Sequence, residues 1–557
     1  MNDLNDNLRK KLKNYYINRQ FNAFEKTIEK LGSIDLLPDF LQSGYAVSKL
    51  LNTTSVKTDY LISYSILKNL QKKNPQNLEF LFNLVLASLK TQNFDYTINI
   101  LLKKYDEKKS DVKILESLGR LYMERADVDK AIKYFEKLVL LNSTEIIDGG
   151  RITYLASLNY LPEISQEFYS KGAFELGEIF ERVSSFSKFQ HISSNDKKIK
   201  IAFVSGDLKT HSVGFFLKGL IESINKKEFN ISLFSNLEKN QHDAMTSFFK
   251  ENCHYWHDIK DYSDTKLIEL IRSSKIDILI DLSGYTQGNR INIFGARCSP
   301  IQILWLGYNN TIGLKNMDYI IADHNLIKEN ELDLYREKIL FLPKIWNAMK
   351  IPNELPDVNI LPYNNNSKFH FGSFNNFQKL SKETIKVWSQ ILNKTDALLF
   401  LKTSSGYNEE IIENLKLKFK NENVNLDQII FLKKKKNFVE HLKDYSNIDV
   451  ALDPFPWTGV TTSFEAHLMG VPVLTLKGFN FNSRCGESIN LNLGQEEFIA
   501  QTTQDYIDKA ILFLSQKSKL LNLRKNLRKK TINSSLFDIN GFTEDFSIIL
   551  KNLINKK

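Results

Sequence analysis

The chain has 557 residues, 42% of them hydrophobic, and this length predicts roughly three to four domains with buried cores of their own. Its net charge of +10 comes from lysines spread along the sequence, which argues against a nucleic-acid-binding surface and leaves anionic small molecules as candidate partners. Three widely separated cysteines exclude a disulfide framework, and no short spacing of cysteines and histidines supplies a zinc site.

The residues that follow Met1 are polar and charged, unlike those of a secretory signal peptide. The longest uncharged stretch, residues 298–314, contains a proline and several polar side chains and is poorly suited to span a bilayer. We therefore expect a cytoplasmic protein without a membrane anchor, in keeping with its few cysteines.

A helical repeat pattern occupies the first part of the chain. Small and aromatic residues downstream of Val112 have the spacing of a tetratricopeptide-like repeat of about 34 residues, and weaker matches lie one and two periods earlier. We expect about three to four repeats within residues 10–145, stacked into a superhelix with a concave side, and capping helices up to residue 180. An irregular helical bundle is the alternative. The best-matching positions are Gly119, Tyr122, Ala131 and Phe135.

The pattern changes at a Ser- and Lys-rich stretch, residues 184–198, where we place a domain boundary. Beyond it, short apolar runs alternate with helical segments, which is typical of buried parallel strands with crossover helices. Two such series predict two α/β domains after the helical repeats, with ligands bound at the carboxyl ends of the strands. The expected domains are residues 1–190, 198–365 and 366–557. The expected strands are 200–205, 230–234, 276–282, 301–306 and 318–321, then 369–374, 397–401, 429–432, 449–452 and 472–476.

The most informative motif, residues 453–465 (DPFPWTGVTTSFE), follows an expected strand and opens a helix. Two interpretations fit it. Thr462 and Glu465 have the spacing of a capping box, which satisfies free amides at a helix start. Alternatively, the same amides and the hydroxyls of Thr461 and Thr462 cradle a diphosphate, while Glu465 holds ribose hydroxyls.

Three further candidates follow other strands. Lys379 ends the segment GSFNNFQK and is suited to neutralise a departing diphosphate without a metal, although most lysines are simply exposed. His211, after the first strand of the first sheet, is suited to act as a general base or to orient an acceptor hydroxyl, or merely packs. His441 begins a helix and either stacks on a base or lies on the surface.

Together with residues 282–286 (LSGYT) and 305–309 (WLGYN), these segments resemble the protein O-GlcNAc transferase and SPINDLY family, glycosyltransferase family 41. The resemblance covers the repeats and nearly all of residues 198–537. It implies a GT-B fold of two Rossmann-like domains. It also implies an inverting, metal-independent transfer of a sugar, GlcNAc in the first instance, from a nucleotide diphosphate to Ser or Thr of proteins.

The resemblance further implies a role for each candidate residue, with a nucleotide sugar and a repeat-bound peptide as partners and with no metal or other cofactor. His211 is expected near the acceptor, Lys379, Thr461 and Thr462 at the diphosphate, Asn376 at a phosphate, His441 against the base and Glu465 at the ribose.

Several departures from the animal enzyme point to a SPINDLY-like or bacterial member and leave the donor open. A GDP-fucose-dependent O-fucosyltransferase is one alternative, and a repeat scaffold that binds nucleotide without turnover is another. A glycan or small-molecule acceptor is a third. The departures are Val460 and Asp277 in place of histidines, Asn376 in place of a glutamine, Phe438 in place of a base-contacting lysine, and the lack of a large insert between residues 344 and 369.

Overall fold

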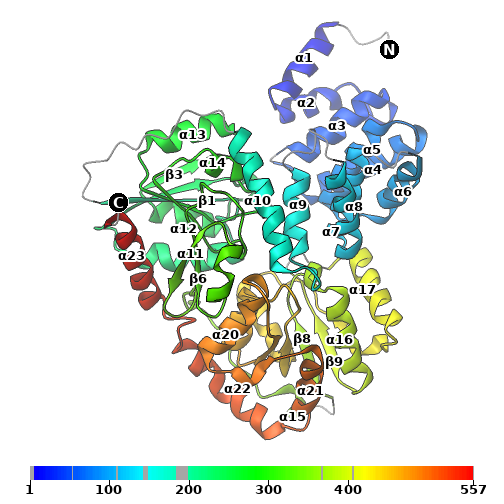
Figure 1. The fold of residues 1–557 in the computed structure, drawn as a ribbon. Coiled ribbons are helices and arrows are strands. Elements are labelled where there is room, and N and C mark those ends of the chain that lie inside the picture. Colours follow the sequence, from blue (N-terminus) through cyan, green and yellow to red (C-terminus); the bar gives the residue numbers. More distant parts are fainter. Residues whose placement is uncertain are drawn as a thin grey trace. The chain divides into compact units, whose positions relative to one another are not determined.

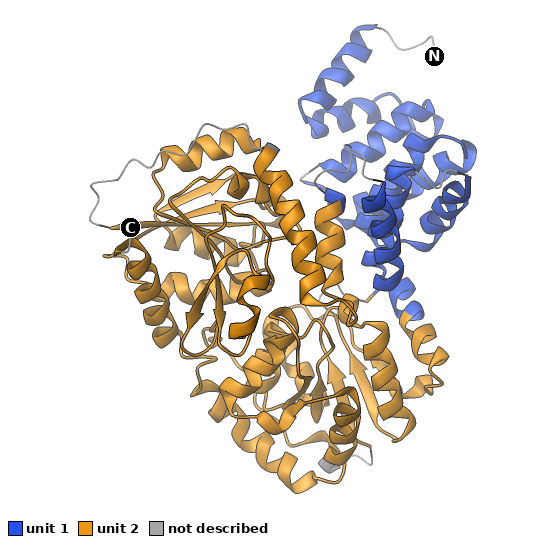
Figure 2. Cartoon of the chain, viewed as in Figure 1, with its two compact units in different colours: residues 1–150, 408–414 blue, residues 151–407, 415–557 orange. Residues whose placement is uncertain are grey.

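The computed structural model describes residues 6–52, 54–107, 111–141, 149–183, 198–365, 368–403 and 407–555. The chain forms two compact units, residues 1–150 with 408–414, and residues 151–407 with 415–557 (Figure 2). Most of the boundary expected at residues 184–198 lies outside the described residues. Among the helices that the structure does describe, none is both long and apolar enough to cross a membrane.

The first unit is a series of antiparallel helical hairpins (Figure 1). Helices α5 and α7 begin at Leu78 and Val112, one repeat period of 34 residues apart. Each start is capped by the side chain of the preceding Asn77 or Asp111. The helices are α1 (Asp6–Ile17), α2 (Phe21–Glu29), α3 (Asp39–Leu51), α4 (Lys57–Lys73), α5 (Leu78–Thr91), α6 (Asp95–Glu107), α7 (Val112–Glu124) and α8 (Val128–Leu140).

The structure explains why one position of the repeat pattern, Gly119, holds a small residue. A Cβ atom on Gly119 would lie 2.4 Å from Cε1 of Phe135, so α7 and α8 pack too closely there for a larger residue. The segment 408–414 belongs to the same unit, where Glu410 Oε2 accepts hydrogen bonds from the amides of Phe94 (2.6 Å) and Asp95 (2.9 Å). This carboxylate therefore caps the start of α6.

The second unit contains two parallel sheets, each flanked by helices (Figure 1). The first has the strand order β3-β2-β1-β4-β5-β6-β7 and the second β10-β9-β8-β11-β12-β13, so each is doubly wound. The strands are β1 (Ile199–Ser205), β2 (Phe229–Ser235), β3 (Tyr255–Asp258), β4 (Ile278–Asp281), β5 (Ile301–Leu304), β6 (Tyr319–Asp323), β7 (Lys338–Leu342), β8 (His370–Ser373), β9 (Leu398–Leu401), β10 (Ile429–Phe431), β11 (Val450–Leu452), β12 (Val473–Leu476) and β13 (Ile499–Ala500).

The expected architecture, helical repeats followed by two Rossmann-like sheets, is confirmed. The buried apolar strands pair in parallel, and most of them are followed by a crossover helix that returns the chain to the same edge, although β5 and β6 are followed by a loop and by a short 3-10 segment. The remaining helices are α9 (Gly149–Leu158), α10 (Gln166–Val183), α11 (Ser212–Ser223), α12 (Ala244–Asn252), α13 (Asp264–Ser273), α14 (Ile291–Gly295), α15 (Pro362–Asn365), α16 (Lys382–Asn393), α17 (Glu409–Asn421), α18 (Phe438–Lys443), α19 (Thr461–Leu468), α20 (Cys485–Leu493), α21 (Thr503–Phe513), α22 (Lys517–Ile532) and α23 (Ile539–Asn555).

Helix α10, expected among the helices that cap the repeats, belongs to the second unit. The second unit has two lobes, the first built on the sheet of β1–β7 and the second on the sheet of β8–β13. A buried network of side-chain amides ties α10 to both lobes: Gln166 Nε2 donates to Asn310 Oδ1 at 2.8 Å, and Asn480 Nδ2 donates to Gln166 Oε1 at 3.0 Å. Asn310 in turn donates to Asn159 Oδ1 at 2.9 Å, and Asn159 donates to Tyr308. The side-chain amides are hydrogen-bond partners for one another, so polar contacts as well as apolar packing fix the position of α10.

Two glycines allow α10 to lie directly against the loop after β5. A Cβ atom on Gly177 would lie 2.1 Å from the carbonyl oxygen of Gly313, and one on Gly313 would lie 2.0 Å from that of Ala173. Gly313 also has a φ of +70°, which L side chains rarely adopt. The two backbones therefore touch without intervening side chains.

The last helix, α23, returns to the first sheet. Its Phe546 ring lies 5.0 Å from the ring of Trp305, and Lys551 Nζ forms an ion pair with Glu228 at 2.6 Å. The region expected as a C-terminal domain, residues 366–557, thus contributes its final helix to the other lobe.

Candidate functional site

The two motifs that follow β8 and β11 meet at the carboxyl ends of those strands. Lys379 Nζ donates hydrogen bonds to the carbonyl oxygen of Thr458 at 2.8 Å and to Asn375 Oδ1 at 3.5 Å. Thr462 Oγ1 donates to the same Asn375 oxygen at 3.1 Å. Segments about 80 residues apart in sequence therefore form one polar cluster at the sheet edge where α/β folds bind ligands.

Asp453 shapes the turn that leads into α19. Its Oδ1 accepts from the amide of Gly459 at 2.6 Å, and its Oδ2 accepts from Thr475 Oγ1 at 2.9 Å. A Cβ atom on Gly459 would lie 2.6 Å from Thr462 Oγ1 and 3.0 Å from Asp453 Oδ1, so the turn requires glycine. Burial raises the pKa of Asp453 to about 7, and its bonds to Gly459 and Thr475 oppose that rise.

The start of α19 faces this cluster. The helix begins at Thr461, directly after Val460, whose side chain cannot cap it. Glu465 does not turn back to the helix start either, because its Oε2 contacts His441 and Tyr445 instead. The capping-box interpretation is therefore wrong, and the first amides of α19 are not satisfied by a side chain of their own helix.

His441 and Glu465, the residues expected to contact the base and the ribose, lie beside each other. His441 Nε2 is 3.0 Å from Glu465 Oε2, and the Tyr445 hydroxyl donates to the same oxygen at 2.9 Å. The His441 ring stacks on Phe438 at a centroid distance of 6.0 Å, and Phe438 contacts Phe215 of α11 at 5.1 Å. This aromatic contact joins the two lobes next to His441.

His211 lies at the first lobe, directly before α11. Its Nδ1 accepts a hydrogen bond from the amide of Val213 at 3.3 Å and lies 3.7 Å from Asp207 Oδ1. Partial desolvation lowers the pKa of His211, while Asp207 opposes the shift. The neutral ring that accepts at Nδ1 carries its hydrogen on Nε2.

Two candidate positions do not join the cluster. Asn376 is exposed, and its side chain accepts a hydrogen bond from the amide of Gln378 at 3.2 Å instead of contacting Lys379. Asp277 lies at the amino end of β4, where its carboxylate accepts from the amide of Lys200 at 2.8 Å. That edge is opposite the carboxyl ends of the strands, so the difference from the animal enzyme at Asp277 does not bear on the ligand site.

Sequence reasoning missed Asn375, Asp453, Tyr445 and Lys402 as members of this site. Asn375 and Asp453 stood inside the quoted motifs, and Lys402 directly follows the buried strand β9. A charged residue at the carboxyl end of a buried strand is a usable signal. The contacts of Tyr445, by contrast, depend on the packing of the 3-10 segment Asp444–Asn447 against α19.

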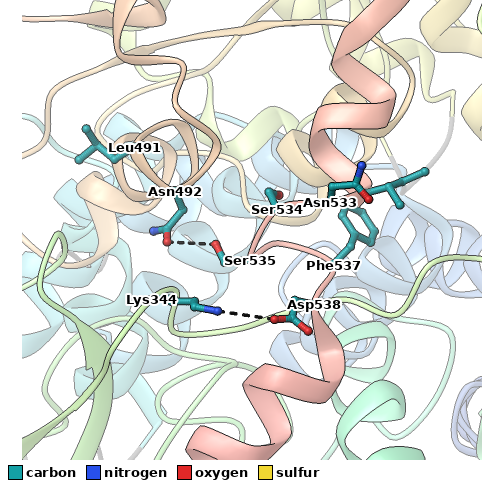
Figure 3. A pocket seen from close by; sticks show the side chains of 9 residues that line it. Lys344, Leu491, Asn492, Asn533, Ser534, Ser535, Phe537 and Asp538 are labelled. Carbon is teal, nitrogen blue, oxygen red and sulfur yellow. Dashed lines mark hydrogen bonds and ion pairs between the residues drawn. The ribbon is translucent and has the colours of Figure 1, made fainter.

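A hollow of about 650 Å³ opens elsewhere in the second unit (Figure 3). Lys344 and Asp538 form an ion pair at 3.6 Å on one side of it, and Ser535 donates to Asn492 at 3.1 Å on another. None of the predicted site residues lines this hollow. Within the described ranges there is also no group of three or more His, Cys, Asp or Glu side chains arranged to hold a metal ion.

The two doubly wound sheets, with a polar cluster at their carboxyl edges, define a GT-B glycosyltransferase architecture. A family model, Glycosyl transferase family 41, matches residues 176–353 and 361–546. The chain belongs to glycosyltransferase family 41. The match begins within α10, in agreement with the place of that helix in the second unit.

Known relatives agree with this assignment. A probable UDP-N-acetylglucosamine–peptide N-acetylglucosaminyltransferase SPINDLY from Hordeum vulgare is 30% identical over 70% of this chain and 42% of its own length. The SPINDLY protein of Solanum lycopersicum is 28% identical over 72% of this chain and 43% of its length. The chain thus spans less than half the length of these curated relatives. The solved O-GlcNAc transferase of Thermobaculum terrenum, a mutant, is 25% identical with a TM-score of 0.83, covering 93% of this chain and 98% of that one.

Proposed function

We propose that the chain transfers a sugar from a nucleoside diphosphate sugar to Ser or Thr hydroxyls of proteins, with inversion and without a metal. The observation that carries this proposal is the meeting of Lys379 with the start of α19, joined through Asn375 and Thr458. An ammonium group and free helix amides at one point suit a departing diphosphate.

Charge on the leaving diphosphate is the main electrostatic demand of such a transfer. Lys379, the Thr461 and Thr462 hydroxyls and the amides of α19 are placed to meet it, and Asn376 adds a phosphate contact once its exposed side chain turns inward. Because Asp453 holds the preceding turn rigid, these donors are preorganised and need little rearrangement in the transition state.

The acceptor hydroxyl attacks the anomeric carbon from the face opposite the diphosphate. His211 is suited to orient that hydroxyl, since Nδ1 already accepts from the amide of Val213, which leaves Nε2–H of the neutral ring as a donor. We therefore assign His211 to acceptor positioning instead of proton removal.

We assign acceptor recognition to the first unit and donor binding to the second. Stacked helical hairpins present extended surfaces that suit an unfolded peptide segment. The SPINDLY relatives are described as probable UDP-N-acetylglucosamine–peptide N-acetylglucosaminyltransferases. GlcNAc is therefore the first donor sugar to test, and Phe438, which offers no hydrogen bond to a base, keeps GDP-fucose as the second.

The deciding experiment measures turnover of UDP-GlcNAc, UDP-glucose and GDP-fucose by the purified chain, with peptide and protein acceptors. The Lys379→Ala variant should lose on the order of 100- to 1,000-fold in rate with the preferred donor. Lys382→Ala, at the exposed start of α16, is the matched control and should retain activity. Nucleotide binding without turnover of any donor would favour a catalytically inactive scaffold.

A further inference from the structure

Lys402 is a buried lysine to which the proposed mechanism gives no role. It directly follows β9, and its amide donates to the carbonyl oxygen of Ser373 at 3.1 Å, which ties it to the end of β8. The side chain is 2% exposed and crosses the face of Phe374, with Nζ 5.4 Å from the ring centroid. The amine at the end of this side chain lies beside His441, an expected contact of the nucleotide sugar.

The Lys402 amine makes two short hydrogen bonds. Its Nζ donates to Asp444 Oδ2 at 2.6 Å and to His441 Nδ1 at 2.8 Å. An ammonium group can only donate, so Nδ1 of His441 must be the acceptor nitrogen and Nε2 must carry the hydrogen. Nε2–H then donates to Glu465 Oε2 at 3.0 Å. A continuous line of hydrogen bonds runs from Asp444 through Lys402 and His441 to Glu465.

Tyr445 completes the arrangement on the far side. Its hydroxyl donates to Glu465 Oε2, the same oxygen that receives the His441 hydrogen. Burial raises the pKa of Tyr445 well above its usual value, so it remains a donor at neutral pH. With Oε2 occupied twice, the carboxylate is fixed, and the structure records no described residue donating to Oε1. That oxygen remains available to a ribose hydroxyl.

A contribution to the stability of the fold does not by itself explain why Lys402 and Asp444 are paired in a buried place. Desolvation lowers the pKa of Lys402, which shows that burial opposes its charge. A buried pair often stabilises a protein no more than apolar residues of similar size would, and Phe374 already offers an apolar surface. What the pair does supply is a fixed hydrogen-bond donor, the Lys402 amine, directed at Nδ1 of His441.

We propose that Lys402, anchored by Asp444, is a positioning residue for donor binding: it holds His441 in the Nε2–H tautomer and thereby orients both the His441 ring and Glu465 toward the nucleoside. This inference rests on the proposed donor-binding role of His441 and Glu465. Lys402 itself does not touch the donor. Its effect should therefore appear in binding of the nucleoside part and leave the diphosphate contacts of Lys379 intact.

The test compares Lys402→Met with Lys402→Arg, which retains the hydrogen-bond donors, and with the double variant Lys402→Met/Asp444→Asn. The double variant removes both charges and avoids a buried aspartate whose remaining ion-pair partner is the exposed Lys435, 3.4 Å from Asp444 Oδ1. Steady-state KM and kcat for donor and for acceptor, calorimetric affinity for UDP and GDP, and melting temperature are measured for each. We expect the donor KM of the Met variants to rise about 10-fold, the order for losing one hydrogen bond to a charged group, with kcat and acceptor KM nearly unchanged. Lys402→Arg should recover most of the donor affinity.

Nitrogen-15 spectra of the histidines provide a readout that a merely structural role would not move. The His441 signals, identified by their loss in His441→Gln, should show a single Nε2–H tautomer in the native chain and a mixture in the folded double variant. A double variant with native donor KM, or with an unchanged tautomer, would overturn the proposal. His441→Ala and Lys379→Ala are measured in parallel: if neither weakens nucleotide binding, the donor site itself is misassigned, whereas weakening by these two alone refutes only the role of Lys402.

Discussion

Lys379, the proposed diphosphate contact, lies in a setting that disfavours its charged form. Desolvation lowers the pKa of Lys379 to about 8, and nearby Asp453 opposes that shift. A lysine with this pKa changes its charge within the range where enzymes are assayed. Binding of a diphosphate at Lys379 is therefore expected to depend on pH in a way that an exposed lysine would not produce.

We expect kcat/KM for the donor to fall as the pH rises through about 8, because the ammonium form of Lys379 predominates below that pH and the neutral amine above it. The pH profile of kcat/KM checks this. In Lys379→Arg, whatever activity remains should lose this alkaline decline, since a guanidinium stays charged. A profile that is flat across pH 8 in the native chain would contradict the assignment, and Lys382→Ala should keep the native profile.

Gly459 offers a second test at the level of single residues. Gly459→Ala should lower donor turnover by about 100-fold, because the added methyl would push against Thr462 Oγ1 and Asn375 Oδ1 and displace the cradle. Turnover and nucleotide affinity are the measurements. Gly149→Ala is the control, since nothing lies within 4 Å of a Cβ at that position. Native turnover by Gly459→Ala would mean that the turn is not part of the site.

At the level of elements, the position of α10 decides where the second unit begins. Removal of α10 would uncover the apolar surface that it buries and would leave Asn310 and Asn480 without their hydrogen bonds to Gln166. The buried residues of the helix are Tyr169, Ala173, Leu176 and Phe180.

We therefore expect a chain that starts at residue 151 to have a near-ultraviolet circular dichroism signal and a cooperative thermal transition. A chain that starts at residue 191 should aggregate, or should melt without a cooperative transition. Circular dichroism and light scattering of the two purified proteins provide the comparison. Equal stability of both chains would show that α9 and α10 are dispensable for the second unit.

The sequence alone predicted the central strands of both sheets well, because continuous apolar runs such as residues 200–205 are recognisable without tertiary information. Both edge strands of the first sheet, β3 and β7, were missed, since Tyr255–Asp258 and Lys338–Leu342 are largely half-buried or exposed, and β13, also missed, has only two residues. Helix α10 was grouped with the repeats because helical periodicity does not reveal which partner covers the apolar face. Lys379, Thr462, His441 and Glu465 were foreseen as a set, but Lys402 was not, because its role arises only from contact with residues about 40 positions away.

At the scale of the whole second unit, an ion pair between Arg484 and Glu331 joins the two lobes. Arg484 Nη1 and Nη2 contact the two oxygens of Glu331 at 2.6 and 2.7 Å, and Nη1 also donates to the carbonyl oxygen of Leu326 at 3.0 Å. The arginine side chain is 9% exposed and the glutamate 16%. Such a bidentate pair fixes the relative position of the two lobes at this contact.

Arg484→Met should lower the free energy of unfolding of the second unit by about 3 kcal/mol, because it leaves Glu331 partly buried without a partner. Urea unfolding monitored by tryptophan fluorescence measures the loss. The double variant Arg484→Met/Glu331→Gln should be less destabilised than Arg484→Met alone, because no unpaired charge remains. A double variant that is as unstable as the sum of both single variants would show that the pair contributes no coupling.

The contact between Gly177 and Gly313 has a consequence for how this sequence can change over generations. Any other residue at either position would collide with the opposite backbone, so neither glycine can be replaced first and the other later. A lineage that altered this contact would have to rebuild α10 and the loop after β5 together. The junction between helix and sheet is therefore expected to drift more slowly than the exposed repeat surface, whatever donor or acceptor its descendants come to use.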